Sequence, residues 1–150
     1  MKKQIFLPKK IYKVIHTHSP IACVDIVVKY GNKFLLGKRK NKPVQNKWWF
    51  PGGRILKGET FKRAVIRKVK EETGLSVKII RYLGIDETIF PDGPFGKPSH
   101  TINIVFLVTP IGSNHKITRD SQHDEFQWFS QINKKWHPYL KKFLELAGFY

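Results

Sequence analysis

Two adjacent glutamates, Glu71 and Glu72, stand near the end of a predicted helix that follows a glycine pair, Gly52-Gly53. Paired glycines let the backbone approach a ligand closely. Because that end of a helix is the negative pole of its dipole, each carboxylate there costs about 0.3–1 kcal/mol. Glu72 also shares the apolar side of the helix with Val65, where a carboxylate needs a counter-charge or a metal. Carboxylate oxygens suit Mg²⁺ or Mn²⁺, so these residues predict a divalent metal site.

The same helix permits a simpler interpretation. Arg67 and Glu71 are four residues apart, as are Lys68 and Glu72, and pairs with this spacing often form ion pairs on a solvated helix face. Two features upstream of the helix, the glycine pair and Glu59, favour the metal site over that alternative.

The span from Gly53 to Leu75 resembles the Nudix box, usually written GX5EX7REUXEEXGU, where U is a bulky aliphatic residue. The matching positions are Gly53, Glu59, Arg67, Val69, Glu71, Glu72, Gly74 and Leu75. One position departs from the pattern, because Lys68 stands where the box has glutamate. The resemblance implies an enzyme, a Nudix hydrolase that cleaves an anionic nucleoside diphosphate compound with a divalent metal. It also implies an α/β fold, the Nudix-type α/β/α sandwich around a mixed β-sheet.

Beyond the box, the chain resembles the GDP-mannose mannosyl hydrolase branch of this family over roughly residues 19–145. The similar segments are 19–21, 34–43, 49–54, 99–101 and 120–125. In that branch water attacks the anomeric carbon of a GDP-sugar and releases GDP and free hexose, so the implied partner is a small nucleotide-sugar. Glu71 is a departure from the branch, which commonly lacks a carboxylate there. Attack on phosphorus, as in an ordinary Nudix diphosphatase, therefore stays open.

The resemblance also implies roles for individual residues. Gly52 through its carbonyl, Glu72 and Gln122 are expected to bind Mg²⁺, with Mn²⁺ as an alternative ion and Glu71 as a further candidate ligand. His123 is the expected general base, since a pKa near 6.5 suits proton transfer at neutral pH. The alternatives are a surface amide at Gln122 and a surface imidazole at His123.

Four further residues are candidates for binding the substrate. Arg39 and Arg54 are expected to clamp the diphosphate and assist its departure, because the planar guanidinium suits phosphate oxygens. The resemblance places Asp25 near the substrate, and His100 is a further candidate contact. The alternatives are surface ion pairs for the arginines, a hydrogen-bonded core aspartate, and a strand-end histidine.

The elements that must position these residues follow from local patterns. The sequence predicts a β-hairpin at 21–30 and 33–39, a helix from Thr60 to Thr73 that ends at Gly74, strands at 77–86, 100–109 and 126–129, and a last helix from Pro138. Residues 1–18 form a basic N-terminal segment without a clear period. With no linker in the pattern, we expect a single domain over residues 1–150.

The chain has a net charge of +17 and a pI near 10.1, which raises the local concentration of anionic partners. Nucleic acid, an acidic membrane surface and a phosphate-bearing substrate all qualify. The lysines are spread along the chain, and nothing resembles a basic tail, an RNP motif or a zinc finger, which disfavours nucleic acid. A non-catalytic, nucleic-acid-binding Nudix module is nonetheless a third hypothesis, because of this charge.

Location and assembly follow from composition and resemblance. No apolar run approaches the roughly 18 residues that a membrane span needs, and Pro8 and Lys9 interrupt the basic start before a signal-peptide core can form. The single cysteine, Cys23, fits a reducing compartment. We therefore expect a cytoplasmic protein without a membrane partner, and the resemblance adds the expectation of a homodimer.

Overall fold

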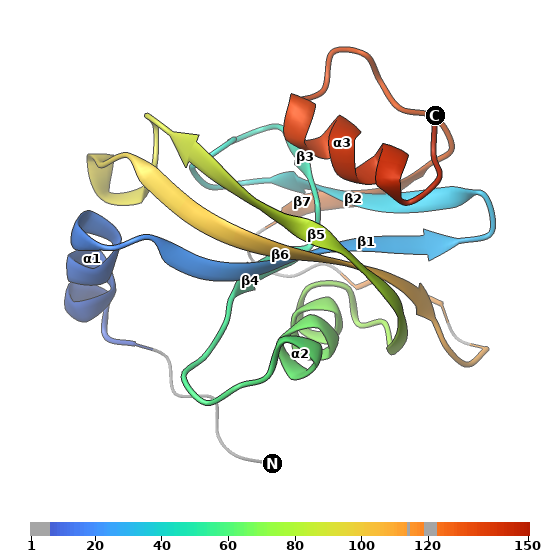
Figure 1. The fold of residues 1–150 in the computed structure, drawn as a ribbon, viewed down its shortest axis with the longest axis horizontal. Helices are drawn as coiled ribbons and strands as arrows, with labels where there is room; N and C mark the ends of the chain where they lie inside the picture. The colour runs from blue at the N-terminus through green and yellow to red at the C-terminus, as the bar shows by residue number, and fades with distance from the viewer. Residues whose placement is uncertain (1–6, 114, 119–122) are drawn as a thin grey trace.

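The computed structural model describes residues 7–113, 115–118 and 123–150 (Figure 1). Its elements in chain order are α1 (Lys9–His18), β1 (Ile21–Tyr30), β2 (Lys33–Arg39), β3 (Trp48–Trp49), β4 (Gly52–Arg54), α2 (Phe61–Thr73), β5 (Val77–Phe90), the 3₁₀ turn η1 (Pro94–Gly96), β6 (Ser99–Pro110), β7 (His123–Phe129) and α3 (Pro138–Leu146). No helix within these ranges is long and apolar enough to cross a membrane.

The strands form a mixed sheet with the order β3-β2-β1-β6-β5, to which β4 adds beside β1 and β7 beside β2. The β1–β6 pair is parallel, and the other strand pairs are antiparallel. β1 and β2 pair only next to their turn, at Lys29–Phe34 and Tyr30–Lys33. The hairpin opens beyond that point, and β4 pairs with the first half of β1. This opening lets β4 join the sheet. The bend at Pro51 and the Gly52-Gly53 pair that begins β4 together form the glycine turn.

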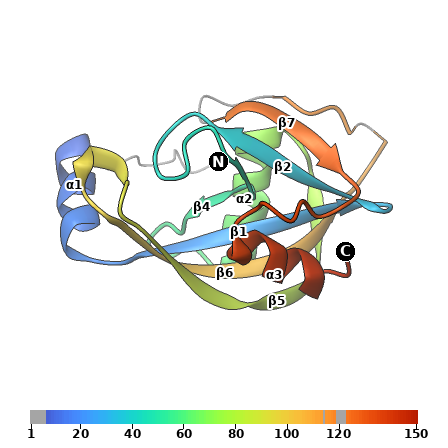
Figure 2. The ribbon, with the colours of Figure 1, turned by 90° about the horizontal axis from the view of Figure 1, so that it is seen from above.

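Helices cover both faces of the sheet, as Figures 1 and 2 show. On one face the core forms around Ala64, Val65 and Val69 of α2. On the other it forms around Leu140, Phe143 and other residues of α3. These layers confirm the predicted α/β/α sandwich around a mixed sheet.

The helix that carries the acidic residues begins and ends where the sequence predicts. The hydroxyl of Thr60 accepts a hydrogen bond from the Arg63 N–H at 3.3 Å, and Gly74 closes the helix in the left-handed conformation, with φ 77°. An N-cap of this kind contributes about 1 kcal/mol. The caps fix the axial position of α2, and therefore the place of its last turn against the sheet.

The sequence prediction was wrong about part of the basic segment 1–18, because residues Lys9–His18 form the helix α1. None of its residues is fully buried, and two of its apolar residues, Ile11 and Val14, are exposed. The structure also extends the predicted strand 77–86 to Phe90 and places η1 in the predicted loop 91–98. α1 and η1 lie together at one end of the sheet (Figure 1).

Candidate active site

Glu72 points from the last turn of α2 toward the glycine turn. Its side chain is 4% exposed, and its Oε2 accepts a hydrogen bond from the Gly52 N–H at 3.0 Å. The inward orientation that the sequence predicts is therefore present, and the solvated-face alternative fails for Glu72. Glu71 beside it is more open, with 33% of its side chain exposed.

The glycine turn needs residues without side chains. A Cβ on Gly52 would collide with the Val24 carbonyl and the Asp25 carboxylate, and a Cβ on Gly53 would lie 2.7 Å from Cε of Lys68. Hydrogen bonds from Ile26 N to the Pro51 carbonyl and from Ile55 N to the Ala22 carbonyl flank the turn. In such an antiparallel ladder the N–H and C=O of the intervening Gly52 face away from β1, on the same side as Glu72.

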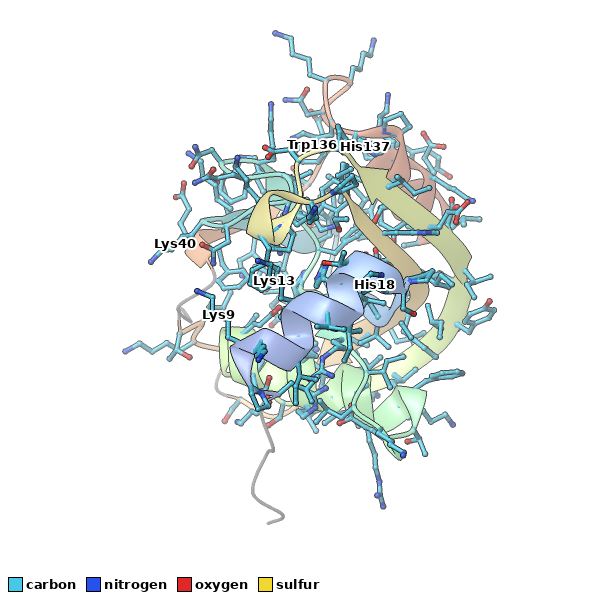
Figure 3. The ribbon with its side chains drawn as sticks, turned by 90° about the vertical axis from the view of Figure 1, so that its left-hand side faces the viewer. Lys9, Lys13, His18, Lys40, Trp136 and His137 are labelled. Carbon is cyan, nitrogen blue, oxygen red and sulfur yellow. The ribbon has the colours of Figure 1, made fainter. Side chains whose placement is uncertain are left out.

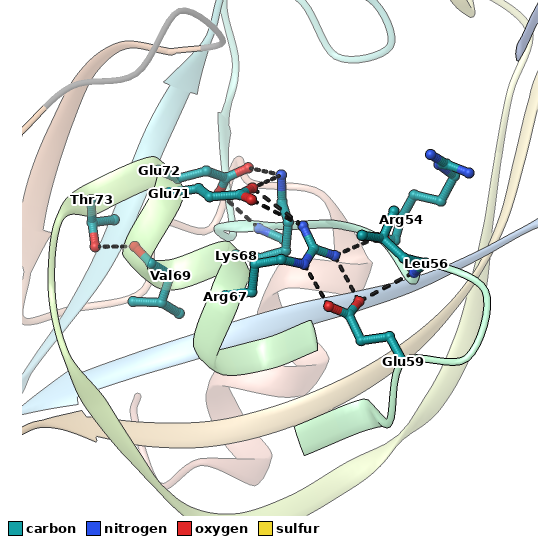
Figure 4. Close-up of polar contacts among 10 residues, drawn as sticks. Arg54, Leu56, Glu59, Arg67, Lys68, Val69, Glu71, Glu72 and Thr73 are labelled. Carbon is teal, nitrogen blue, oxygen red and sulfur yellow. Dashed lines mark hydrogen bonds and ion pairs between the residues drawn. The ribbon is translucent and has the colours of Figure 1, made fainter. Parts of the chain in front are cut away.

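Lys68 lies between the two acids (Figure 4). Its Nζ is 3.5 Å from Oε2 of Glu71 and 3.3 Å from Oε1 of Glu72. Only 17% of the Lys68 side chain is exposed. The residue that departs from the box therefore sits inside the site, with its ammonium shared by both carboxylates.

Arg67 and Glu59 brace the loop that precedes α2 (Figure 4). The guanidinium binds Glu59 through two hydrogen bonds, at 2.6 and 2.8 Å, and donates another to the Arg54 carbonyl at 3.0 Å. Glu59 also accepts from the Leu56 N–H at 3.2 Å. The Arg67 hydrogen bond holds the pKa of Glu59 below its ordinary value. Through these contacts Glu59 and Arg67 hold the loop between β4 and α2 against the helix. Arg67 also donates a hydrogen bond to Glu71 at 3.2 Å.

A pocket of about 650 Å³ lies beside the glycine turn, a size that suits a small-molecule ligand. Five of the residues that the sequence singles out line it: Asp25, Arg39, Gly52, Gly53 and Arg54. The Nε of Arg39 donates to the Pro43 carbonyl at 2.9 Å, which holds that side chain along the loop after β2. The pocket therefore combines two arginines with the backbone that Glu72 contacts.

Asp25 is a buried carboxylate on the wall of this pocket. It is 7% exposed, and its Oδ2 accepts a hydrogen bond from the Tyr139 hydroxyl at 2.7 Å. Burial raises the pKa of Asp25 to about 7, against the opposing effects of the Tyr139 hydrogen bond and of Arg39. Asp25 therefore has the buried hydrogen-bond partner of the simpler interpretation and also lines the pocket, while its contact with a substrate stays a prediction.

The floor of the pocket is polar but uncharged, a feature that the sequence prediction did not include. Thr88 on β5 and Thr101 on β6 share a hydroxyl–hydroxyl bond of 2.7 Å, and the Asn103 amide donates to Thr88 at 3.4 Å. The rings of Trp49 and Phe90, 5.7 Å apart, complete this part of the lining. These strand positions carry no motif, and their only sequence signal is that polar residues alternate with apolar ones.

α1 supplies the outer wall of the pocket, which the sequence prediction also missed. Tyr12 and His16 line the pocket together with Phe95 of η1, and their ring centroids lie 4.9–6.1 Å apart. The Arg54 guanidinium stands 5.7 Å from the centre of the Tyr12 ring, within cation–π range. Figure 3 views this end of the molecule, with α1 across the front and Lys9 and Lys13 along it.

For three of the predicted site residues, His100, Gln122 and His123, the structure shows no side chain that lines this pocket. His100 binds Glu87 at 2.9 Å on the more exposed surface of β5 and β6 and does not line the pocket. Gln122 lies outside the described residues. His123 begins β7 opposite Arg39 in the strand register, and its side chain also lies outside the described part.

The donor chemistry at the end of α2 fits a hard divalent cation. Glu72, Glu71 and the Gly52 carbonyl offer oxygens, as Mg²⁺ prefers, and the Lys68 ammonium shows that the two carboxylates already hold a cation. Among the described side chains, no three from His, Cys, Asp and Glu gather as a metal cluster. A metal here would therefore be held by Glu72, the Gly52 carbonyl and further oxygens, for which Glu71 and the predicted Gln122 are candidates.

The fold, the box helix and the acidic residues at its end define a Nudix hydrolase. The NUDIX domain family model matches residues 19–146, and the chain belongs to this family. Nudix hydrolases act on small nucleoside diphosphate derivatives and generally use a divalent metal ion. α1 precedes the matched range.

Several known proteins are similar to this chain. The ADP-ribose pyrophosphatase of Methanocaldococcus jannaschii is 42% identical over 125 residues, 83% of this chain and 71% of the relative. The low-salt glycan biosynthesis protein Agl8 of Haloferax volcanii is 30% identical over 141 residues, 93% of this chain and 89% of the relative. The crystal structure of a MutT NUDIX hydrolase from Burkholderia pseudomallei superposes with a TM-score of 0.72 at 23% identity, covering 87% of this chain and 99% of that one, which supports the fold.

Proposed function

We propose that this Nudix hydrolase cleaves a GDP-hexose, GDP-mannose or GDP-glucose, to GDP and free hexose, with Mg²⁺ or Mn²⁺ and with water attacking the anomeric carbon. The observation that carries the proposal is the two-part lining of the pocket. Arginines stand beside the glycine turn, and a neutral polar floor lies next to aromatic rings. A nucleotide-sugar has the matching two parts, an anionic diphosphate and an uncharged polyol.

Departure of the diphosphate requires that its growing negative charge be neutralised. Arg39 and Arg54 both line the pocket, and their guanidinium forks suit paired phosphate oxygens. A divalent ion bound at Glu72 and the Gly52 carbonyl would add positive charge to the leaving group. Together these groups would make GDP a good leaving group without protonation.

The neutral floor suits the hexose. Hydroxyls and an amide from Thr88, Thr101 and Asn103 can donate and accept hydrogen bonds with sugar hydroxyls. The buried Asp25 adds a strong acceptor. The ring of Trp49, which lines the pocket, is apolar surface that the C–H side of a pyranose can contact. The proposal keeps His123 as the base that takes the proton from water, because its ordinary pKa suits the task.

The position of Lys68 favours carbon over phosphorus as the attacked atom. Attack on phosphorus in an ordinary Nudix enzyme relies on box carboxylates that share metals around the water. Here an ammonium takes the place of one carboxylate and contacts two others. Attack at carbon needs the metal only at the leaving diphosphate, so this site retains what that reaction requires.

A second candidate is hydrolysis at phosphorus, with an ADP-ribose-like compound as substrate. Two observations favour it: Glu71 is retained beside Glu72, and a 42% identical relative is named ADP-ribose pyrophosphatase. Under this alternative the products would be two monophosphates. The cytoplasmic location, the homodimer and the absence of a nucleic-acid partner stay predictions from the sequence under either candidate.

The test is hydrolysis of GDP-mannose in ¹⁸O-labelled water with Mg²⁺, followed by mass spectrometry of the products, with GDP-glucose and ADP-ribose in parallel. We expect label in free mannose and unlabelled GDP. Label in a phosphate, with GMP and mannose 1-phosphate as products, would overturn attack at carbon and support the second candidate. No turnover of any of the three compounds with Mg²⁺ or Mn²⁺ would overturn both.

A further inference from the structure

Lys68 is held in the site much more firmly than a surface lysine. Its stem passes over Gly53, where even a methyl group would lie 2.7 Å from Cε. Its ammonium contacts Glu71 and Glu72, and 17% of the side chain is exposed. Lys70, two residues on, instead reaches the Gly74 carbonyl on the exposed surface. The glycine turn therefore provides the space that the Lys68 stem occupies.

The charge at this end of α2 is nearly balanced by the protein itself. Arg67 and Lys68 face Glu59, Glu71 and Glu72, which leaves one net negative charge. A glutamate at position 68, as the box pattern has it, would leave three. Because buried charges need opposite charges beside them, the smaller negative charge favours fewer divalent ions at these carboxylates than the larger one would.

We propose that the Lys68 ammonium acts as a permanent internal cation that replaces one divalent metal ion, so that this site binds a single Mg²⁺ or Mn²⁺. Glu72 and the Gly52 carbonyl would hold the metal, while the ammonium keeps its contacts with Glu71 and with Oε1 of Glu72. Lys68 is a positioning residue in this scheme, since it determines how many metals the acids take. The inference rests on the proposed metal-dependent function, but not on which nucleotide-sugar is cleaved.

Counting bound Mn²⁺ tests this directly, without substrate. The electron paramagnetic resonance signal of free Mn²⁺ is titrated with the full-length protein, giving the number of sites and their dissociation constants. We expect one site in the wild type and two in Lys68→Glu. Lys68→Gln should keep one site with about tenfold tighter binding, because an adjacent like charge is removed. Lys62→Glu and Lys62→Gln are the matched controls, since they change charge equally at an exposed position on the first turn of α2.

Two sites in the wild type would overturn the proposal, as would a single site in a folded Lys68→Glu variant. If circular dichroism shows that Lys68→Glu does not fold, the dissociation constant of Lys68→Gln decides: an unchanged value, or one equal to that of Lys62→Gln, contradicts the proposal. The metal count is independent of the labelling experiment. If the labelling experiment shows that water does not attack carbon, the number of bound Mn²⁺ ions is unaffected. If that number differs from the prediction, the assignment of the products is unaffected.

Discussion

Replacing Asp25 with asparagine is expected to remove a large part of the pH dependence of stability. Asp25 is buried, and its pKa in the folded protein is about 7, against an ordinary value of 3.8. Because the folded state binds this proton more tightly than the unfolded state, the stabilisation is present below about pH 4 and is lost as pH rises through 7. With about 1.4 kcal/mol for each pH unit between the two pKa values, the loss amounts to at most about 4 kcal/mol.

Asparagine has nearly the same shape and keeps an oxygen that can accept the Tyr139 hydroxyl, which donates to Asp25 at 2.7 Å. The assay is urea unfolding of both proteins at half-unit steps from pH 4.5 to 8.5. The free energy of unfolding of Asp25→Asn minus that of the wild type should rise across this range, most steeply between pH 5 and 7. Its pH dependence is the test, since the absolute difference also contains the lost attraction between Asp25 and Arg39.

Asp86→Asn is a control in which the pKa of the carboxyl is shifted the other way and the effect on stability should be flat over this pH range. Asp86 binds Lys142 at 2.8 Å near the surface, and the Lys142 hydrogen bond lowers its pKa. That pair stabilises the fold above the unfolded pKa of 3.8 and loses its effect only as pH falls below that value. The variant should therefore be less stable than wild type by a small amount that stays constant from pH 4.5 to 8.5. A difference between Asp25→Asn and wild type that stays flat from pH 4.5 to 8.5 would refute the reasoning for Asp25.

Three further predictions concern the site. His123→Gln should slow turnover of GDP-mannose about 10²–10⁴-fold, as expected for loss of a general base, and a steady-state rate near that of wild type would remove His123 from the mechanism. Glu72→Gln should weaken activation by Mg²⁺ at least tenfold, because a carboxylate ligand is lost; a metal titration of activity that matches wild type would contradict its ligand role. Gly52→Ala should destabilise the fold by about 1–3 kcal/mol, since its Cβ would meet the Val24 carbonyl; unchanged thermal unfolding would show that the turn has more room than the structure indicates.

Local patterns were enough to predict the elements that position the box. The two capping residues of the helix Phe61–Thr73, Thr60 and Gly74, are recognisable from the sequence. The hairpin of β1 and β2 follows from a β-branched run at 21–30 and an apolar run at 33–39 on either side of a Gly-Asn turn. The inward orientation of Glu72 was predicted from its helical spacing to Val65 together with the upstream glycine pair and Glu59. Each of these predictions depends on residues close together in the chain.

The remainder of the site depends on contacts that local patterns do not encode. Asp25 and the Tyr139 hydroxyl that binds it are 114 residues apart, and Tyr139 looks like one more apolar residue of α3. Thr88 and Thr101 meet only because β5 and β6 pair in one particular register. α1 was missed because it contributes pocket residues but no fully buried ones. The sequence singled out Gly52, Gly53 and Arg54 on one side of the pocket, whereas tertiary structure was needed to find the residues of the other side.

The place of Lys68 inside the site also could not be predicted from the sequence. The sequence shows that it departs from the box and is four residues from Glu72, which is equally compatible with a solvated ion pair. Only the packing of its stem over Gly53 and its two carboxylate contacts show that its charge lies inside the site.

The proposed site brings a divalent cation and a diphosphate together between the end of α2 and the glycine turn. A crystal grown with Mn²⁺ and GDP, measured at an X-ray energy where manganese scatters anomalously, tests it most directly. We predict one anomalous peak at coordination distance from a Glu72 oxygen and the Gly52 carbonyl, with the phosphates within hydrogen-bond reach of Arg39 and Arg54. A manganese peak away from Glu72, or GDP bound with its phosphates outside the pocket, would contradict the account.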